Sequence, residues 1–235
     1  MIGAWPPARD AAAQSARGPV HLGGCGRAAG PRRPPRRRAV PGRGRGRHAA
    51  LHSRCADVAA RAATGEGPVV LVGHSGAGAL LPAVAAALPG RVRAALFVDA
   101  LLPHPGRSWF DTAAPELREQ LRSLAREGRL PPWHEWFPAG AVAGLLPDAT
   151  VRERFLAEVP ELPLAYFEER APEVPDWSPA RCGYVRLSEA YDREAGDAAA
   201  LGWPVYREDA DHLAMLTRPA AVAELLGRLV SAYTS

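Results

Sequence analysis

Residues 68–78 read Pro-Val-Val-Leu-Val-Gly-His-Ser-Gly-Ala-Gly, so a short apolar run leads directly into a glycine-rich turn that contains Ser75. The run Val69–Val72 is wholly apolar and mostly β-branched, which is typical of a strand buried on both faces of a sheet. The segment 79–88 that follows is rich in alanine and leucine and favours a helix. The stretch therefore predicts a strand, a sharp turn that carries a serine, and a helix.

This order of elements is typical of a nucleophile elbow, in which a strained turn presents a serine hydroxyl at the end of a strand. The residues two places before and after the serine crowd the turn and have to be small, and Gly73 and Ala77 are small. The usual pattern is Gly-x-Ser-x-Gly, so Ala77 is a mild departure from it. We therefore expect Ser75 to be a catalytic nucleophile.

Three further strand-like segments follow, separated by helical segments. The segment 93–98 is apolar after Arg93 and is followed by Asp99, and the carboxyl end of such a strand faces the crevice where α/β sheets bind ligands. Segments 182–188 and 202–207 predict the third and fourth strands, and residues 219–230 place apolar side chains at helical spacing. This alternation predicts an α/β fold with a parallel sheet.

His212 is the last histidine of the chain and lies between the short strand predicted at 205–207 and a helix. Together with the elbow at Ser75, this order resembles the α/β-hydrolase family, in which the serine, the acid and the histidine follow one another along the chain. The resemblance extends from about residue 50 to residue 235. It implies helices on both faces of the sheet, and the chain looks similar to small serine esterases and hydroxynitrile lyases.

The resemblance implies that His212 is the general base, because an imidazole can take a serine proton at neutral pH. A carboxylate should orient that imidazole. The family usually places the carboxylate after the strand predicted at 183–188, which favours Asp192 and then Glu189 in the same loop. Asp99 is a third candidate, because some hydrolases of this fold take the acid from after the earlier strand.

The tetrahedral oxyanion of acyl transfer needs two hydrogen-bond donors. One should be the backbone N–H of Gly76, at the N-terminus of the helix that follows Ser75. The resemblance implies a second donor from an early loop, for which Gly23 and Gly24 are the candidates. We expect no metal site and no cofactor, and the three widely spaced cysteines favour the reducing cytoplasm as the location.

Residues 104–181 contain no clear strand pattern, whereas 115–126 and 151–159 predict helices. In the family a helical cap is inserted at this point of the chain and roofs the active site. The segment is rich in aromatic residues, which favours a largely apolar pocket. The residues that we expect to line this pocket are His74, Trp109, Trp133 and Trp136.

Residues 1–48 differ in composition from the rest of the chain. The first fifty residues contain eleven arginines, one acidic residue and only four of Leu, Ile, Val and Phe. So little apolar surface cannot offset the entropy cost of ordering a segment, so we expect an irregular structure here and the hydrolase core over 49–235. Two explanations stay open: an arginine-rich arm that binds a polyanion, and a degenerate or mis-specified N-terminus, which we favour.

At 235 residues and 47% hydrophobic content, the chain can form one domain with a sizeable core, and no apolar run approaches the ~20 residues of a membrane span. We predict a serine hydrolase that cleaves a small, largely apolar ester or related acyl substrate through an acyl-enzyme. The alternatives are a non-catalytic family relative that lacks a complete oxyanion hole, and polyanion binding through the N-terminal arm. The expected partner is a small molecule, not a membrane or nucleic acid, and the sequence carries no signal for an oligomeric state.

Overall fold

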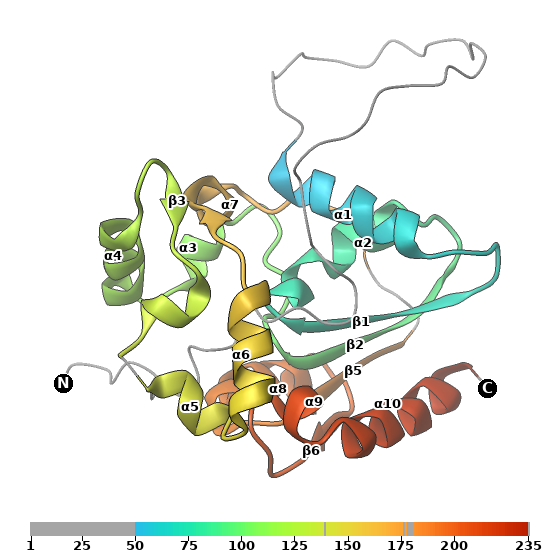
Figure 1. Cartoon of the computed structure of the whole chain (residues 1–235). Helices are drawn as coiled ribbons and strands as arrows, with labels where there is room; N and C mark the ends of the chain where they lie inside the picture. Colours follow the sequence, from blue (N-terminus) through green and yellow to red (C-terminus); the bar gives the residue numbers. More distant parts are fainter. Residues whose placement is uncertain (1–49, 139, 176, 178–180, 235) are drawn as a thin grey trace, which may run out of the picture.

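The computed structural model describes residues 50–138, 140–175, 177 and 181–234 (Figure 1). The predictions for residues 1–48, including the candidate oxyanion donors Gly23 and Gly24, lie outside this part of the chain. Within it, the predicted α/β fold with a parallel sheet is confirmed.

The main sheet of the described residues has four parallel strands in the order β1-β2-β5-β6. They are β1 (Val69–Ser75), β2 (Val92–Ala100), β5 (Arg181–Arg186) and β6 (Val205–Arg207), so each of the four predicted strands is present. Because the strands are parallel, their carboxyl ends lie at one edge of the sheet. Ser75 and Asp99 both lie at this edge, which is where the candidate site must be sought.

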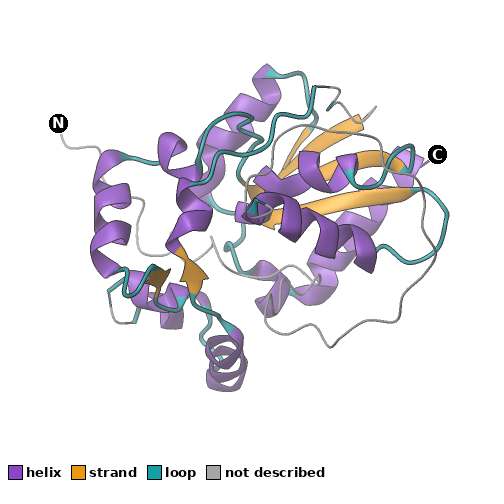
Figure 2. Ribbon diagram, turned by 90° about the horizontal axis from the view of Figure 1, so that it is seen from above, coloured by secondary structure: helices purple, strands orange, loops and turns teal. Residues whose placement is uncertain are grey.

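Four helices cover the two faces of the sheet: α1 (Leu51–Ala62), α2 (Leu81–Ala86), α8 (Asp192–Ala200) and α10 (Pro219–Thr234) (Figures 1 and 2). Successive side chains of a strand point to opposite faces, and β2 shows how the helices are divided. Ala95 and Phe97 pack in one cluster with residues of α2 and α8, whereas Leu96 and Val98 pack with residues of α10. α1 packs on α2, so it lies on the same side of the sheet as α2.

The segment after Ser75 is not one continuous helix. A 3-10 turn, η2 (Gly76–Leu80), leads into α2, which begins at Leu81. Pro82 therefore lies in the first turn of α2, where a backbone N–H would have no partner within the helix. The α-helix is therefore shorter than the one predicted at 79–88, since α2 spans Leu81–Ala86. Pro82 breaks no hydrogen bond within it.

Between β2 and β5 the chain forms a separate layer with its own aromatic core, which we call the insertion (Figure 2). The helices predicted at 115–126 and 151–159 correspond to α4 (Pro115–Leu124) and α6 (Ala149–Glu158). Two very short strands, β3 (Arg129–Leu130) and β4 (Leu162–Pro163), pair antiparallel and were not expected, because two residues show no alternation of side chains. The elements are α3 (Trp109–Thr112), α4 (Pro115–Leu124), β3 (Arg129–Leu130), η3 (Trp133–Trp136), α5 (Ala141–Leu145), α6 (Ala149–Glu158), β4 (Leu162–Pro163) and α7 (Leu164–Glu168).

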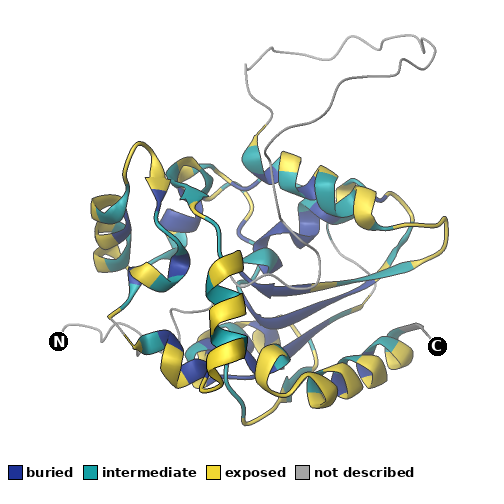
Figure 3. Cartoon of the chain, viewed as in Figure 1, coloured by how far each residue is buried: buried dark blue, intermediate teal, exposed yellow. Residues whose placement is uncertain are grey.

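The strand β1 is less buried than its apolar sequence predicts, whereas β2 is buried along most of its length (Figure 3). Val72 is 44% exposed, and residues 69–71 are half-buried. Val70 packs against the cluster under α10, but Val72 is not part of that cluster. Among the described residues β1 is hydrogen-bonded to β2 alone. The prediction of a strand buried on both faces is therefore wrong at Val72, whereas residues 73–75 at the end of β1 are buried.

Candidate active site

Ser75 ends β1 in a backbone conformation that residues other than glycine rarely adopt. Its φ is 57° and its ψ is −134°, a combination that costs of order 1–3 kcal/mol. The next residue begins η2, so the chain turns sharply from strand to helix, as the sequence predicts for an elbow. The Ser75 side chain is 1% exposed, and its Oγ has no hydrogen-bond partner in the part of the chain that the structure describes.

The tight approach at this turn involves Gly73 and Gly78. A Cβ atom added to Gly73 would lie 3.0 Å from the Cα of Gly78. A Cβ atom added to Gly78 would collide with the backbone oxygen of Leu101 and lie 2.9 Å from the Cβ of Ala100. Ala77 is half-buried, and its methyl group is accommodated. The small residues that the turn requires are therefore two before and three after Ser75, which explains the departure at Ala77.

Asp99 lies in a β-bulge near the end of β2. In the register of β1 and β2, His74 is opposite Val98 and Ser75 is opposite Ala100, so Asp99 is an extra residue without a partner. Its φ is 39°, a second positive value at the same edge of the sheet. A bulge bends the strand and changes the direction of the side chain that it carries. Here the side chain is that of Asp99, and its carboxylate contacts the loops after β5 and β6.

The Asp99 carboxylate is fully buried and accepts several hydrogen bonds. His212 Nδ1 lies 2.9 Å from its Oδ2, and Ser188 Oγ donates to the same oxygen at 2.6 Å. The backbone N–H groups of Leu187 and Ser188 also donate to the carboxylate, at 2.5 Å and 3.0 Å. Burial alone would raise the pKa of Asp99, but the hydrogen bonds and the neighbouring imidazole lower it below its ordinary value. Asp99 is therefore ionised at neutral pH.

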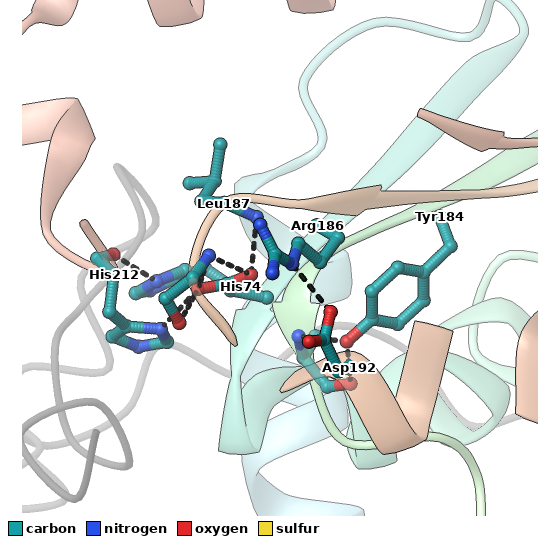
Figure 4. A network of polar contacts seen from close by, with 9 residues as sticks. His74, Tyr184, Arg186, Leu187, Asp192 and His212 are labelled. Carbon is teal, nitrogen blue, oxygen red and sulfur yellow. Dashed lines mark hydrogen bonds and ion pairs between the residues drawn. The ribbon is translucent and has the colours of Figure 1, made fainter. Parts of the chain in front are cut away.

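The two acids preferred from the sequence do not take this place. Asp192 pairs with Arg186 at 2.7 Å and with Arg207 at 3.0 Å, and its side chain is half exposed. Glu189 is exposed at the start of the short 3-10 turn η4 (Glu189–Tyr191). Figure 4 shows the Arg186–Asp192 pair apart from the contacts around His212. The geometry thus favours Asp99 over Asp192 and Glu189 as the partner of His212: two arginines hold Asp192, and the bulge brings Asp99 to the imidazole.

The His212 imidazole is fully buried and lies against two other rings. The centroid of the His74 ring is 4.2 Å away at an interplanar angle of 32°, and the centroid of the Tyr191 ring is 5.0 Å away at 11°. His74 Nε2 also lies 3.0 Å from the backbone oxygen of His212 (Figure 4). Within the described residues, His212 Nε2 makes no hydrogen bond. Nε2 of His212 and Oγ of Ser75 are therefore two buried polar atoms that are both available for chemistry.

The three tryptophans expected to line the pocket form part of the insertion's core instead. Trp109, Trp133 and Trp136 belong to its buried aromatic cluster, and Trp133 is 0% exposed. A small cavity of about 30 Å³ lies elsewhere, between α2 and the loops after β2 and before β5. Neither the three tryptophans nor His74 line this cavity. Its wall is formed by Ala79, Pro82, Ala83, Pro103, His104, Pro105, Ala171, Pro172, Val174 and Trp177. The rings of the three tryptophans pack edge-to-face on other aromatic rings, and their role in lining a substrate pocket stays a prediction.

The remaining candidates concern the oxyanion and metals. Gly76 is the first residue of η2, and the first N–H groups of a helix have no partner within it. In the part of the chain that the structure describes, no group of three or more His, Cys, Asp or Glu side chains could hold a metal ion. None of the helices described there is long and apolar enough to cross a membrane.

Three residues that support the Asp99–His212 contact were not predicted. Ser188 is the last residue of the predicted third strand, and a hydroxyl at that edge of the sheet was the signal that could have identified it. Tyr184 fixes the backbone beside the bulge, because its hydroxyl donates to the Ala100 oxygen at 2.9 Å and accepts from the Ala100 N–H at 3.0 Å. Nothing in the sequence indicates this contact or the stacking of Tyr191 on His212.

A model of the alpha/beta hydrolase family matches residues 6–225, which is nearly the whole chain. The chain therefore belongs to the α/β-hydrolase family and is an enzyme of that family. The resemblance seen in the sequence starts at about residue 50, whereas the family match already begins at residue 6. A search of curated proteins finds no significant match.

Solved structures with the same fold include several hydrolases. An extracellular alpha/beta-hydrolase from a Paenibacillus species, described as sharing structural and functional homology with tobacco Salicylic Acid Binding Protein 2, is 19% identical, with a TM-score of 0.61 over 75% of this chain and 78% of that one. Polyneuridine aldehyde esterase is 15% identical, with a TM-score of 0.53 over 76% and 78% of the two chains. Tomato methylketone synthase I complexed with 2-tridecanone is 14% identical, with a TM-score of 0.55 over 77% and 79%. At these identities the likeness establishes the fold.

Proposed function

We propose that this protein is a serine hydrolase that cleaves a small, largely apolar ester or related acyl substrate through an acyl-enzyme. In this proposal Ser75 is the nucleophile, His212 is the general base, and Asp99 is the acid that orients His212. The observation that carries the proposal is the buried 2.9 Å contact between Asp99 and His212. It lies at the same edge of the sheet as the strained turn of Ser75.

The contact with Asp99 selects one tautomer of His212. An ionised carboxylate only accepts hydrogen bonds, so Nδ1 carries the proton and Nε2 keeps its lone pair. That lone pair takes the proton of the Ser75 hydroxyl as Oγ bonds to the acyl carbon, and the imidazolium then gives the proton to the leaving alcohol. A water molecule attacks the acyl-enzyme in the same way and releases the carboxylic acid. Asp99 remains ionised and stabilises the imidazolium in both steps.

The oxyanion donors complete the proposal. We assign one donor to the N–H of Gly76, since it lies directly after the nucleophile at the start of η2. Gly23 and Gly24 remain the proposed source of the second donor. Removal of one such donor typically slows the reaction by about 10²–10³-fold, so the second donor strongly affects the rate.

The preference for an apolar substrate follows from the position of the insertion. Leu213, the residue after His212, is fully buried in the insertion's aromatic cluster, and Met215 packs against the same cluster. The insertion therefore lies directly against the loop that carries the base, as a cap over the site would. An apolar cap in this position would favour a substrate with little charge.

The test is hydrolysis of p-nitrophenyl acetate by the full chain and by three variants. Ser75→Ala should lower kcat/KM by ~10³-fold or more, and Asp99→Asn by ~10²–10⁴-fold because the imidazole loses its orienting acceptor. Asp192→Asn is the matched control, since it removes a half-exposed carboxylate that pairs with Arg186 and Arg207 rather than with His212, and it should change the rate by less than about 2-fold.

Two results would contradict this assignment. If Ser75→Ala hydrolyses the ester at the wild-type rate, Ser75 is not the nucleophile. If the wild-type chain is folded but inactive toward this ester and toward other small activated esters, the non-catalytic alternative is favoured.

A further inference from the structure

His74 makes two separate contacts with His212, one through its ring and one through a nitrogen. The two imidazole centroids lie 4.2 Å apart, and His74 Nε2 lies 3.0 Å from the backbone oxygen of His212. Both side chains are buried, with His74 6% exposed and His212 0% exposed. A contact of this kind between residues 138 positions apart joins β1 directly to the loop after β6.

The protonation of His74 Nε2 follows from the chemistry of its partner. A backbone carbonyl oxygen only accepts hydrogen bonds, so Nε2 of His74 must carry a hydrogen and donate it. The donated hydrogen bond fixes the main chain of residue 212. The ring contact restricts the tilt of the His212 imidazole.

These two constraints complement the one that Asp99 supplies. A single hydrogen bond to Nδ1 fixes one atom of the imidazole but still allows the ring to pivot about that atom. A neighbouring ring against its face and a fixed backbone remove this freedom. Tyr191 adds a second, nearly parallel ring at 5.0 Å. The position of His212 Nε2, which has to meet the Ser75 proton, is therefore set by several contacts together.

The location of His74 in the chain gives these contacts a specific consequence. His74 directly precedes Ser75 on β1, and its register partner Val98 directly precedes Asp99 on β2. A small movement of β1 relative to the loop of His212 thus changes the nucleophile and the contacts of the base together. His74 couples the position of the base to the position of the nucleophile.

We infer that His74 is a positioning residue of the proposed reaction, which holds the His212 imidazole in line with Ser75 through its ring and its Nε2–H. This inference rests on the proposed function. It differs from the expectation of the sequence analysis, in which His74 lines the substrate pocket. A lining residue acts on substrate binding, whereas a positioning residue acts on the chemical step.

Two substitutions separate the two contacts of His74. His74→Gln keeps an N–H at a similar distance from the backbone but removes the ring, and His74→Phe keeps a ring but removes the donor. His134→Gln is the matched control, because His134 lies in η3, away from these contacts. The assay measures kcat and KM for p-nitrophenyl acetate per folded molecule, with the folded fraction taken from circular dichroism at the assay temperature.

Both His74 variants should lower kcat by about 10-fold or more, because misplacement of a reacting group by a fraction of an ångström to 1 Å slows chemistry steeply. KM should stay within about 2-fold, as expected when only the transition state loses an interaction. The control should leave both constants unchanged. A KM increase at unchanged kcat, wild-type values of both constants in both variants, or an equal loss in the control would overturn the inference.

A failure of the inference is distinguishable from a failure of the proposed function. The wild-type chain and Ser75→Ala are assayed beside the His74 variants. Loss of activity in Ser75→Ala together with unchanged kcat in both His74 variants would leave the serine mechanism in place and reject only the role of His74. Full activity in Ser75→Ala would reject the proposed function itself.

Discussion

Asp99 is itself the extra residue of a bulge in β2, and the bulge sets the position of its side chain. The bulge leaves Asp99 without a partner on β1, and the backbone there has a positive φ of 39°. The carboxylate consequently contacts the ends of two loops, where Ser188 Oγ donates to it at 2.6 Å and His212 Nδ1 lies at 2.9 Å. Ser188 follows β5, the strand after which the acid was expected. A hydroxyl after β5 thus supports an acid that comes from β2.

Stability should depend on Asp99 over a defined pH range. The folded state lowers the pKa of Asp99, so its ionised form favours folding above the ordinary carboxyl pKa of 3.8. This contribution is lost as the pH falls below that value toward the folded-state pKa. Asp99→Asn should therefore lower the free energy of unfolding at neutral pH by about 1–3 kcal/mol, with a smaller difference from wild type at about pH 3.

Urea denaturation of both proteins at the two pH values measures this difference. A difference that stays constant, or that grows as the pH falls, would show that the Asp99 carboxylate is not preferentially ionised in the folded state. Asp192→Asn serves as the comparison, since its half-exposed carboxylate pairs with Arg186 and Arg207 rather than with His212.

At the scale of the elements, the close approach of η2 to the end of β2 decides how the elbow packs. A Cβ atom on Gly78 would meet the Leu101 oxygen and the Ala100 Cβ, and neither atom belongs to a flexible side chain. Gly78→Ala should therefore destabilise the protein by about 1–3 kcal/mol through overpacking. Thermal and urea unfolding measure the change.

Gly227 offers a matched control for this substitution. It lies in the interior of α10, and an added Cβ would meet no atom within 4 Å. Gly227→Ala should raise stability by about 0.4–1 kcal/mol, because alanine loses less backbone entropy than glycine in a helix. If both substitutions have the same effect, the contact at Gly78 is not the cause of its sensitivity.

In the whole molecule, several contacts join the insertion and its flanking chain to the core. The Glu169 carboxylate, just after α7, accepts hydrogen bonds from the N–H groups of Leu51 and His52 at the start of α1, at 2.6 Å and 3.0 Å. His52 Nδ1 also lies 2.8 Å from Glu169. On the other side, Leu213 inserts the loop of the base into the aromatic cluster. The candidate site thus lies between two layers that are tied together at separate points.

The features that the sequence predicted are local ones. The order of strands and helices, and the turn at Ser75, follow from residues that are neighbours in the chain. The proposed acid does not, because the choice of Asp99 depends on a bulge of one residue and on arginines from two strands that hold Asp192. The tryptophans illustrate the same limit: composition indicates an apolar insertion, but only packing decides whether a ring faces a cavity or a core.

The most direct measurement of the central claim is the site of covalent labelling by a fluorophosphonate probe. Such a probe reacts with a serine that a neighbouring base activates, so it tests the nucleophile and the Asp99–His212 pair at once. Intact-mass analysis followed by peptide mapping should find one adduct, on Ser75, that forms more slowly in Asp99→Asn and at the wild-type rate in Asp192→Asn. An adduct on another residue, or a folded wild-type chain that remains unlabelled, would contradict the account.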